Sequence, residues 1–233
     1  MGFIVKITTK CEFLDLLCPY RCRGCNKLGK VFCDCCKKNL VLKRKNFCPI
    51  CHKENNRKCD DCDLVFDRIW TVGFRDEIIG SLIKEYKYQS VRKIGDVLTD
   101  IMDTILPDLN DNVVIVPLPT IARHIRERGL DHTALVAKKI AKKRRLKMQK
   151  IIKRSKNTVQ VGADMKKRQD QARKAYMVED KISPEMTYLL IDDVWTTGSS
   201  MISAAEILRQ NGATKIYGAV FAVNRENSEI IDS

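Results

Sequence analysis

Residues 188–200 read Tyr188-Leu189-Leu190-Ile191-Asp192-Asp193-Val194-Trp195-Thr196-Thr197-Gly198-Ser199-Ser200. The apolar run at 188–191 predicts a strand that is buried on both faces, because no polar residues alternate with the apolar ones. Two acids end this strand, and a hydroxyl-rich turn around one glycine leads into an amphipathic helix predicted over 201–211. We therefore expect a strand–turn–helix unit whose polar side chains gather at the carboxyl end of the strand.

This turn has the chemistry of a phosphate site. Backbone N–H groups and hydroxyls of residues 196–200 would converge at the N-terminus of the helix, where anions are favoured. Asp192 and Asp193 would repel the same phosphate, so we expect them to face neutral hydroxyls or a group that carries Mg²⁺. A sugar phosphate meets both demands. The alternative is a helix start with ordinary capping residues, which leaves the two adjacent acids unexplained.

Strands and helices alternate around this unit. Apolar runs predict further strands at 68–74, 113–116 and 216–223, and helical spacing predicts helices at 77–88, 91–106 and 130–145. The polar, basic stretch 150–171 is expected to be loop-rich. The alternation predicts an α/β domain over residues 67–233, with a parallel sheet and a ligand site at the carboxyl ends of its strands.

The first 66 residues differ in composition. All 11 cysteines lie between Cys11 and Cys62, and eight of them form C-x2-C pairs whose spacing repeats after 26 residues. The pairs are Cys22/Cys25, Cys33/Cys36, Cys48/Cys51 and Cys59/Cys62.

Paired thiolates at this spacing predict two structural Zn²⁺ sites with four cysteines each, so we expect residues 1–66 to form a small double zinc ribbon. The repeat favours ligands that pair consecutively, although an interleaved arrangement also fits the spacing. Redox-active or idle thiols are the alternative, but a redox C-x2-C motif needs a βαβ context that this segment lacks. His52 follows Cys51 directly and is expected to be a surface residue.

The net charge of +14 comes mainly from one segment. Between Lys138 and Lys174 there are 16 basic residues and two acids, Asp164 and Asp170. Such a patch attracts polyphosphates, nucleic acid or another acidic surface. A solvated, lysine-rich helix face would explain part of the run without any partner.

The overall composition is that of a globular protein. Hydrophobic residues make up 44% and charged residues 31%, which excludes a mostly disordered or collagen-like chain. No apolar run approaches the ~18 residues of a membrane-spanning helix. The N-terminus has no basic segment followed by an apolar core, as a signal peptide would. The sequence therefore predicts a cytoplasmic protein without membrane insertion.

Residues 188–200 resemble the motif of type I phosphoribosyltransferases that binds 5-phosphoribosyl 1-diphosphate (PRPP). That motif has four mostly apolar residues, two acids, Thr-Thr-Gly and a hydroxyl-bearing end, where Ser200 stands in place of the common threonine. The resemblance implies that Asp192 and Asp193 are the catalytic acids, which hold the ribose hydroxyls of Mg²⁺-PRPP. The implied loop for the 5′-phosphate comprises Thr196, Thr197, Gly198, Ser199 and Ser200.

Two further segments narrow the resemblance to one family. Val116-Pro117-Leu118-Pro119 and the basic stretch 123–131 are similar to the V-P-x-P…R-x-x-R-x-R-G-F-N/D signature of the ComF family of DNA-uptake competence proteins, with Leu130 in place of phenylalanine. Arg154, Thr158, Gln160 and Arg168 match that family's R-x-x-x-T-x-x-Q…R segment. A zinc module with paired cysteines precedes both segments, as in that family, and the resemblance runs from Cys22 to about Val223.

The basic stretch also contributes candidate ligand residues. Guanidinium groups suit phosphate oxygens, so we expect Arg123, Arg126 and Arg128 to surround the pyrophosphate of a ligand held by the loop. A solvated basic turn is the alternative. His124 and His132 are expected on the surface, and Trp195 is expected either to stack on a ligand or to pack beside the loop.

Three functions fit these observations. A ComF-like protein would act on or with single-stranded DNA during natural transformation, with a competence helicase and recombination-mediator proteins as the partners that the resemblance implies. A phosphoribosyltransferase would transfer the 5-phosphoribosyl group from PRPP to an acceptor, although the stretch 150–171 is cationic and not an apolar, aromatic hood for a nucleobase. A binding module would use PRPP or a nucleotide only as a regulatory ligand. The sequence does not separate the last two, because groups that bind PRPP also stabilise its reaction.

Overall fold

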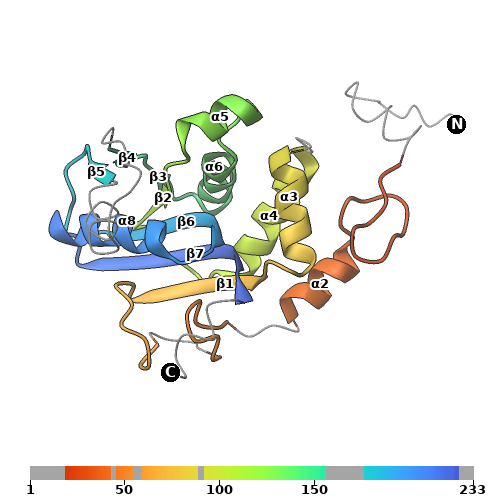
Figure 1. Cartoon of the computed structure of the whole chain (residues 1–233), viewed down its shortest axis with the longest axis horizontal. Coiled ribbons are helices and arrows are strands. Elements are labelled where there is room, and N and C mark those ends of the chain that lie inside the picture. The colour runs from red at the N-terminus through yellow and green to blue at the C-terminus, as the bar shows by residue number, and fades with distance from the viewer. Residues whose placement is uncertain (1–18, 43–45, 55–58, 89–91, 156–175, 226–233) are drawn as a thin grey trace, which may run out of the picture.

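The computed structural model describes residues 19–42, 46–54, 59–88, 92–155 and 176–225 (Figure 1). Its elements are α2 (Asp34–Leu42), β1 (Arg68–Phe74), α3 (Ile78–Tyr88), α4 (Arg92–Ile105), β2 (Val113–Pro117), α5 (Ala122–Arg128), α6 (His132–Arg144), β3 (Lys147–Met148), β4 (Ile152–Arg154), β5 (Tyr176–Val178), β6 (Thr187–Trp195), α8 (Ser199–Gln210) and β7 (Lys215–Val223).

The principal sheet has five strands in the order β1-β7-β6-β2-β3, and every neighbouring pair is parallel. The α/β fold with a parallel sheet is therefore confirmed. β6 lies at the centre, and its residues 187–191 are all buried, as its continuous apolar run requires. A separate antiparallel pair, β4 and β5, lies beside α8 (Figure 1).

Helices cover both faces of this sheet. The amphipathic helices α3, α4 and α6 pack on one face, in a core that contains Trp70, Ile115 and Leu189. Helix α8 packs on the other face, where Leu190 and Leu208 belong to a second core. Successive strand residues point to opposite faces, so Leu189 and Leu190 belong to different cores.

The two cysteine-rich halves have the same local structure, as their repeated spacing predicts. The N–H of Cys22 donates to the carbonyl of Lys27 at 2.8 Å, and the equivalent bond recurs 26 residues later. The residue after the second cysteine has a left-handed backbone in both halves, with φ of 61° at Asn26 and 58° at His52. We conclude that one C-x2-C turn is used twice.

Each cysteine-rich half packs on a different face of the sheet. Phe32 and Leu40 of the first half enter the core under α3 and α4. Phe47 and Phe66 enter the core on the α8 face. Both hydrophobic cores are thus shared between the cysteine-rich residues and the sheet, and the domain boundary after residue 66 stays a prediction.

Several elements differ from the expectations. Helix α5 occupies the expected basic turn, and it has no buried residue that could produce an apolar periodicity. Strand β4 lies within the stretch expected to be loop-rich, whose residues 156–171 lie outside the described residues. Helix α2 and the two-residue strand β3 were also not predicted. Within the described part of the chain, no helix combines the length and the apolar character that a membrane span requires.

Candidate functional site

Asp192 and Asp193 lie where the central strand β6 runs past its neighbour. Pairing with β2 ends at Ile191, so both acids extend beyond β2 at the carboxyl edge of the sheet. Asp193 forms an ion pair with Lys87 of α3 through Nζ and Oδ2, and the two side chains are 23% and 16% exposed. This edge is the usual ligand site of a parallel sheet. Lys87 was not among the site residues that the sequence predicted.

The two acids have different environments. Burial and the negative charge of Asp193 raise the pKa of Asp192 to about 8. The N–H of Asp193, 2.8 Å from Asp192 Oδ1, and the cations Lys87 and Arg154 act in the opposite direction. Two adjacent carboxylates in this setting favour a bound proton, a cation or ligand hydroxyls that donate to them.

The predicted phosphate loop forms a tight turn at the start of α8. Gly198 has φ 75°, and a Cβ there would lie 2.2 Å from the ring of Trp195, which packs under the loop. Trp195 is buried, so it is a packing residue and not an exposed stacking one. Thr197 Oγ1 and Ser199 Oγ are 2.8 Å apart, and both residues are exposed. Hydroxyls and the first backbone N–H groups of α8, which have no partner within the helix, therefore gather at one helix N-terminus, as a phosphate requires.

Two residues beside this loop were not among the predicted site residues. The hydroxyl of Tyr176 in β5 is within hydrogen-bonding reach of the Ser200 side chain. Arg154 in β4 donates to that hydroxyl at 3.1 Å and to the carbonyl of Pro119 at 3.2 Å. Its positive charge also acts on Asp192. The family-like motif contained Arg154, but only the β4–β5 pair brings it to the acids.

The three candidate pyrophosphate residues lie along α5 and do not share one face. At 3.6 residues per turn, Arg126 and Arg128 lie about 160° apart around the helix. Arg123 is exposed and pairs with Glu127 at 3.0 Å. Arg128 stacks on the ring of Tyr88, 5.1 Å from its centroid. The role of all three in binding pyrophosphate stays a prediction, and Arg128 is the one that contacts α3.

His132 departs from the expectation of a surface residue. It begins α6, is only 4% exposed and packs edge-on against Tyr86 at 4.6 Å between ring centroids. It also lines a small cavity together with Lys87 and Asp193, and its Nε2 has no hydrogen-bond partner among the described residues. The basic sequence around it suggested solvent exposure, whereas the side chain is buried against Tyr86, beside the cavity that Asp193 also lines.

The eight paired cysteines form two separate clusters. Cys22, Cys25, Cys33 and Cys36 form one, and Cys48, Cys51, Cys59 and Cys62 form the other, with the sulfur atoms of each within 4.8 Å of one another. Ligands therefore pair consecutively, as the repeat favoured. Cys25 and Cys33 sulfurs are 3.7 Å apart, close to the edge of about 3.8 Å that Zn–S bonds of about 2.3 Å give in a tetrahedron. Each cluster can hold a zinc ion.

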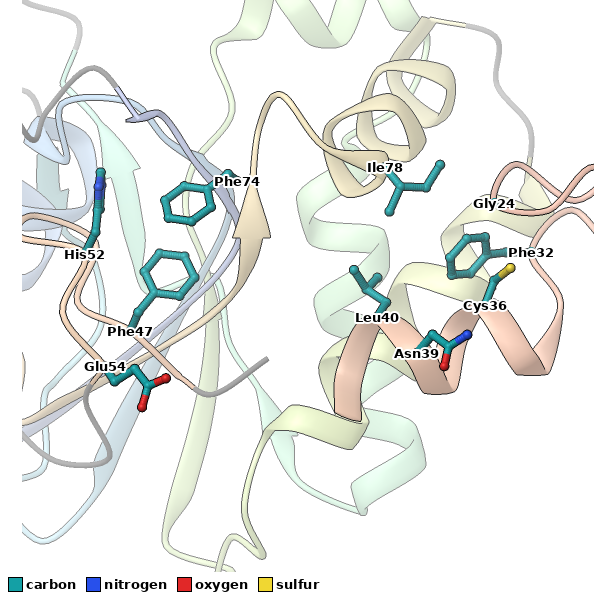
Figure 2. A pocket seen from close by; sticks show the side chains of 10 residues that line it. All are labelled: Gly24, Phe32, Cys36, Asn39, Leu40, Phe47, His52, Glu54, Phe74 and Ile78. Atoms are coloured by element: carbon teal, nitrogen blue, oxygen red, sulfur yellow. The ribbon is translucent and has the colours of Figure 1, made fainter. Parts of the chain in front are cut away.

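A cavity of about 590 Å³ lies between the two cysteine-rich halves (Figure 2). Phe47, Phe74 and His52 line one side, and Phe32 and Leu40 line the other. The rings of Phe47 and Phe74 stack with centroids 4.6 Å apart, and His52 meets Phe74 edge-on at 5.1 Å. His52 is thus half-buried among aromatic rings and lies outside both sulfur clusters. The acid pair and the hydroxyl loop do not line this cavity.

Known proteins that are similar to this chain include a competence protein and a phosphoribosyltransferase. No family model matches the chain. The chain is 26% identical to "Competence protein F" of Haemophilus influenzae over 224 residues, which cover 88% of this chain and 96% of that protein. The resemblance to the ComF family is confirmed.

A second similarity concerns a shorter part of the chain. It is 46% identical over 50 residues to the orotate phosphoribosyltransferase of Pyrococcus abyssi, a match that covers 22% of this chain and 27% of that enzyme. The likeness to a ComF protein thus spans nearly the whole chain, whereas the likeness to this phosphoribosyltransferase is local. Of the ComF-like motif residues, Thr158, Gln160 and Arg168 lie outside the described residues.

The basic segment of this ComF-like chain is partly neutralised within the fold. Lys139, Lys143 and Arg144 of α6 form ion pairs with Asp96, Asp100 and Asp103 of α4. In contrast, Lys138, Lys142, Arg145 and Lys147 are exposed, and the described residues give them no ion pair. A lysine-rich helix face therefore explains part of the segment up to residue 155, and its cations between Lys156 and Lys174 lie outside the described residues.

Proposed function

We propose that this chain is a ComF-like competence protein whose sheet domain binds Mg²⁺-PRPP and which acts with single-stranded DNA in the cytoplasm during natural transformation. One observation supports the binding of Mg²⁺-PRPP: the acid pair at the end of β6 adjoins a hydroxyl-lined turn at the N-terminus of α8. The similarity to Competence protein F supports the biological role.

Different residues bind different parts of the ligand. Asp192 and Asp193 accept hydrogen bonds from the ribose hydroxyls, which suit carboxylates better than phosphate does. The 5′-phosphate lies at residues 196–200, where the helix dipole and the backbone N–H groups of the helix start stabilise negative charge. Lys87 pairs with Asp193, and the charge of Arg154 acts on Asp192, so these two cations beside the acid pair favour the diphosphate.

Carboxylate oxygens are ligands that Mg²⁺ accepts, and a cation beside Asp192 would offset the burial and the charge of Asp193 that raise the pKa of this carboxyl. When bound, Mg²⁺ would neutralise charge on the diphosphate. Lys87 already compensates the charge of Asp193, one of the two acids.

The proposal is tested by titrating the zinc-loaded full chain with Mg²⁺-PRPP. We expect saturable binding in the wild type and its loss in Asp192→Asn/Asp193→Asn, measured by calorimetry. Phosphorus NMR of the same samples reports pyrophosphate release. If the wild type does not bind, the PRPP assignment fails. Binding that survives in the double variant would place the ligand elsewhere.

The nucleic-acid part has its own test. Gel shifts with single-stranded DNA at two salt concentrations should show weaker binding at higher salt, because cations that replace counterions produce that dependence. The exposed cations of α6 are the candidate contacts. Binding that is absent or independent of salt would contradict this part. A helicase and a recombination mediator are the partners that a role in transformation would require.

Catalytic transfer is a second candidate function, because a cavity beside the acid pair has room for another ligand. The cavity has a volume of about 580 Å³, within the usual range for small-molecule sites. Pyrophosphate that appears only when an acceptor is present would support transfer. Binding without turnover across a broad acceptor panel would favour a regulatory ligand.

A further inference from the structure

A second cavity opens at the same edge of the sheet as the acid pair. Arg75, directly after β1, lines one side of it, and Val194 of β6, directly after Asp193, lines another. Helix α3 forms the remaining wall with Ser81, Lys84, Lys87 and Tyr88. Because Lys87 also pairs with Asp193, this cavity and the proposed ribose site meet at one side chain.

The wall of this cavity is closely packed. The carbonyl oxygen of Arg75 lies 1.8 Å from the position that a Cβ of Gly80 would occupy. The backbone of Arg75 can therefore approach α3 only because residue 80 is glycine. The N–H of Arg75 is also fixed, by a bond of 2.9 Å to the carbonyl of Val223. The cavity therefore lies between the end of β1 and helix α3, and these contacts fix the position of both.

The charge of the cavity is positive. Three of its lining residues are cations, and none is an acid. The neighbouring acids Asp76 and Glu77 pair with Arg225 at 2.8 and 2.9 Å. Within the described residues, Arg75 and Lys84 form no ion pair, and both are exposed. Their charges are therefore available to a ligand.

Neutral donors complete the set. The hydroxyl of Tyr88 accepts a bond from Arg128 at 3.3 Å, which leaves its own proton free to donate. Ser81 adds a second hydroxyl. Cations combined with hydroxyl donors match phosphate and carboxylate oxygens, which are acceptors only.

We propose that this cavity binds the second ligand of the site, a small organic anion that carries a phosphate or carboxylate group. Arg75 and Lys84 bind its anionic group, and Lys87 lies between it and the ribose held by Asp193. The inference rests on the proposed function for the position of the ribose, but the anion subsite itself depends only on the cavity and its charges.

Phenyl phosphate is the test probe, titrated into the zinc-loaded full chain that ribose 5-phosphate has already saturated. We expect one equivalent to bind, and Arg75→Ala/Lys84→Ala to weaken this binding at least tenfold while ribose 5-phosphate binds as before. Lys142→Ala/Arg145→Ala is the matched control. It removes the same charge near the far end of α6, about 20 Å along the helix from His132 at the acid pair.

The outcomes separate the two proposals. Failure of phenyl phosphate to bind, or equal weakening by both double variants, overturns the subsite. If ribose 5-phosphate does not bind but phenyl phosphate still depends on Arg75 and Lys84, the proposed function fails and the subsite stands. Displacement of phenyl phosphate by a single-stranded oligothymidylate would show that the cavity binds nucleic acid and would contradict the proposal of a small organic anion.

Discussion

Asp192 places a negative charge where the folded protein disfavours it. Its pKa is raised to about 8, whereas the unfolded carboxyl has the ordinary value of 3.8. Between these values the folded state binds the proton more strongly than the unfolded state does. The free energy of unfolding therefore falls as the pH rises from about 4 to about 8.

Replacing this acid with its neutral isostere should stabilise the protein. We expect Asp192→Asn to be more stable than the wild type by about 1–3 kcal/mol at pH 8 and nearly equal to it at pH 4. Urea unfolding at both pH values measures the difference. The exposed Asp108 gives the control, since Asp108→Asn should change neither value. If the difference in the free energy of unfolding were the same at both pH values, the pKa of Asp192 would not be raised in the folded protein.

The same residues show what a linear sequence conveys about a site. Asp192, Asp193 and the hydroxyls of residues 196–200 are adjacent in the chain, so the motif predicted their proximity. Lys87 reads as one lysine among many on an amphipathic helix, and only the packing of α3 brings it to Asp193. Arg154 depends in the same way on the β4–β5 pair.

At the scale of elements, burial decided what the sequence could predict. β2 and β6 are continuous apolar runs, and both were predicted because they are buried on both faces. Helix α5 buries no residue, so its basic sequence gave no helical period. The charge of α6 was visible in the sequence, but its partners on α4 lie about 40 residues away in the chain.

Arg144 is the strongest link between α6 and α4. Its guanidinium donates to the Asp103 carboxylate at 2.6 Å and to the carbonyls of Asp103, Leu106 and Pro107 near the end of α4. Carbonyls at and just beyond the end of a helix have no partner in the helical ladder, so Arg144 acts as a C-terminal cap of α4, which ends at Ile105.

Removing this cap should destabilise the fold without weakening DNA binding. We expect Arg144→Met to lower the free energy of unfolding by about 2–3 kcal/mol, because charged hydrogen bonds are lost and Asp103 keeps its charge. Lys142→Met, at an exposed position of the same helix, should change stability by less than about 0.5 kcal/mol. Urea unfolding compares the two. DNA affinity that falls more in Arg144→Met than in Lys142→Met would contradict the assignment of the exposed cations as DNA contacts.

At the scale of the whole molecule, the two sulfur clusters brace opposite faces of one sheet. They differ in enclosure, because Cys48, Cys59 and Cys62 are buried in the second cluster while only Cys22 is buried in the first. A chelator reaches exposed ligands sooner, so we expect the zinc-loaded protein to release its metal in two steps, with the first cluster releasing zinc first.

The first cluster also contacts α3, the helix whose Lys87 pairs with Asp193 of the acid pair. Arg23, between two cysteines of that cluster, pairs with Glu85 of α3 at 2.8 Å. Two residues further along α3, Lys87 pairs with Asp193. We therefore expect Cys25→Ser to remove the fast zinc step and to weaken ribose 5-phosphate binding severalfold.

A colorimetric chelator measures the release, and calorimetry measures the affinity. The exposed Cys35 lies in the same segment but outside both clusters, so Cys35→Ser should match the wild type in both measurements. If Cys25→Ser loses the fast step yet binds ribose 5-phosphate like the wild type, the first zinc cluster braces only its own segment. If its affinity falls as expected, two ion pairs on α3, Arg23–Glu85 and Lys87–Asp193, link the first zinc cluster to the carboxyl edge of the sheet.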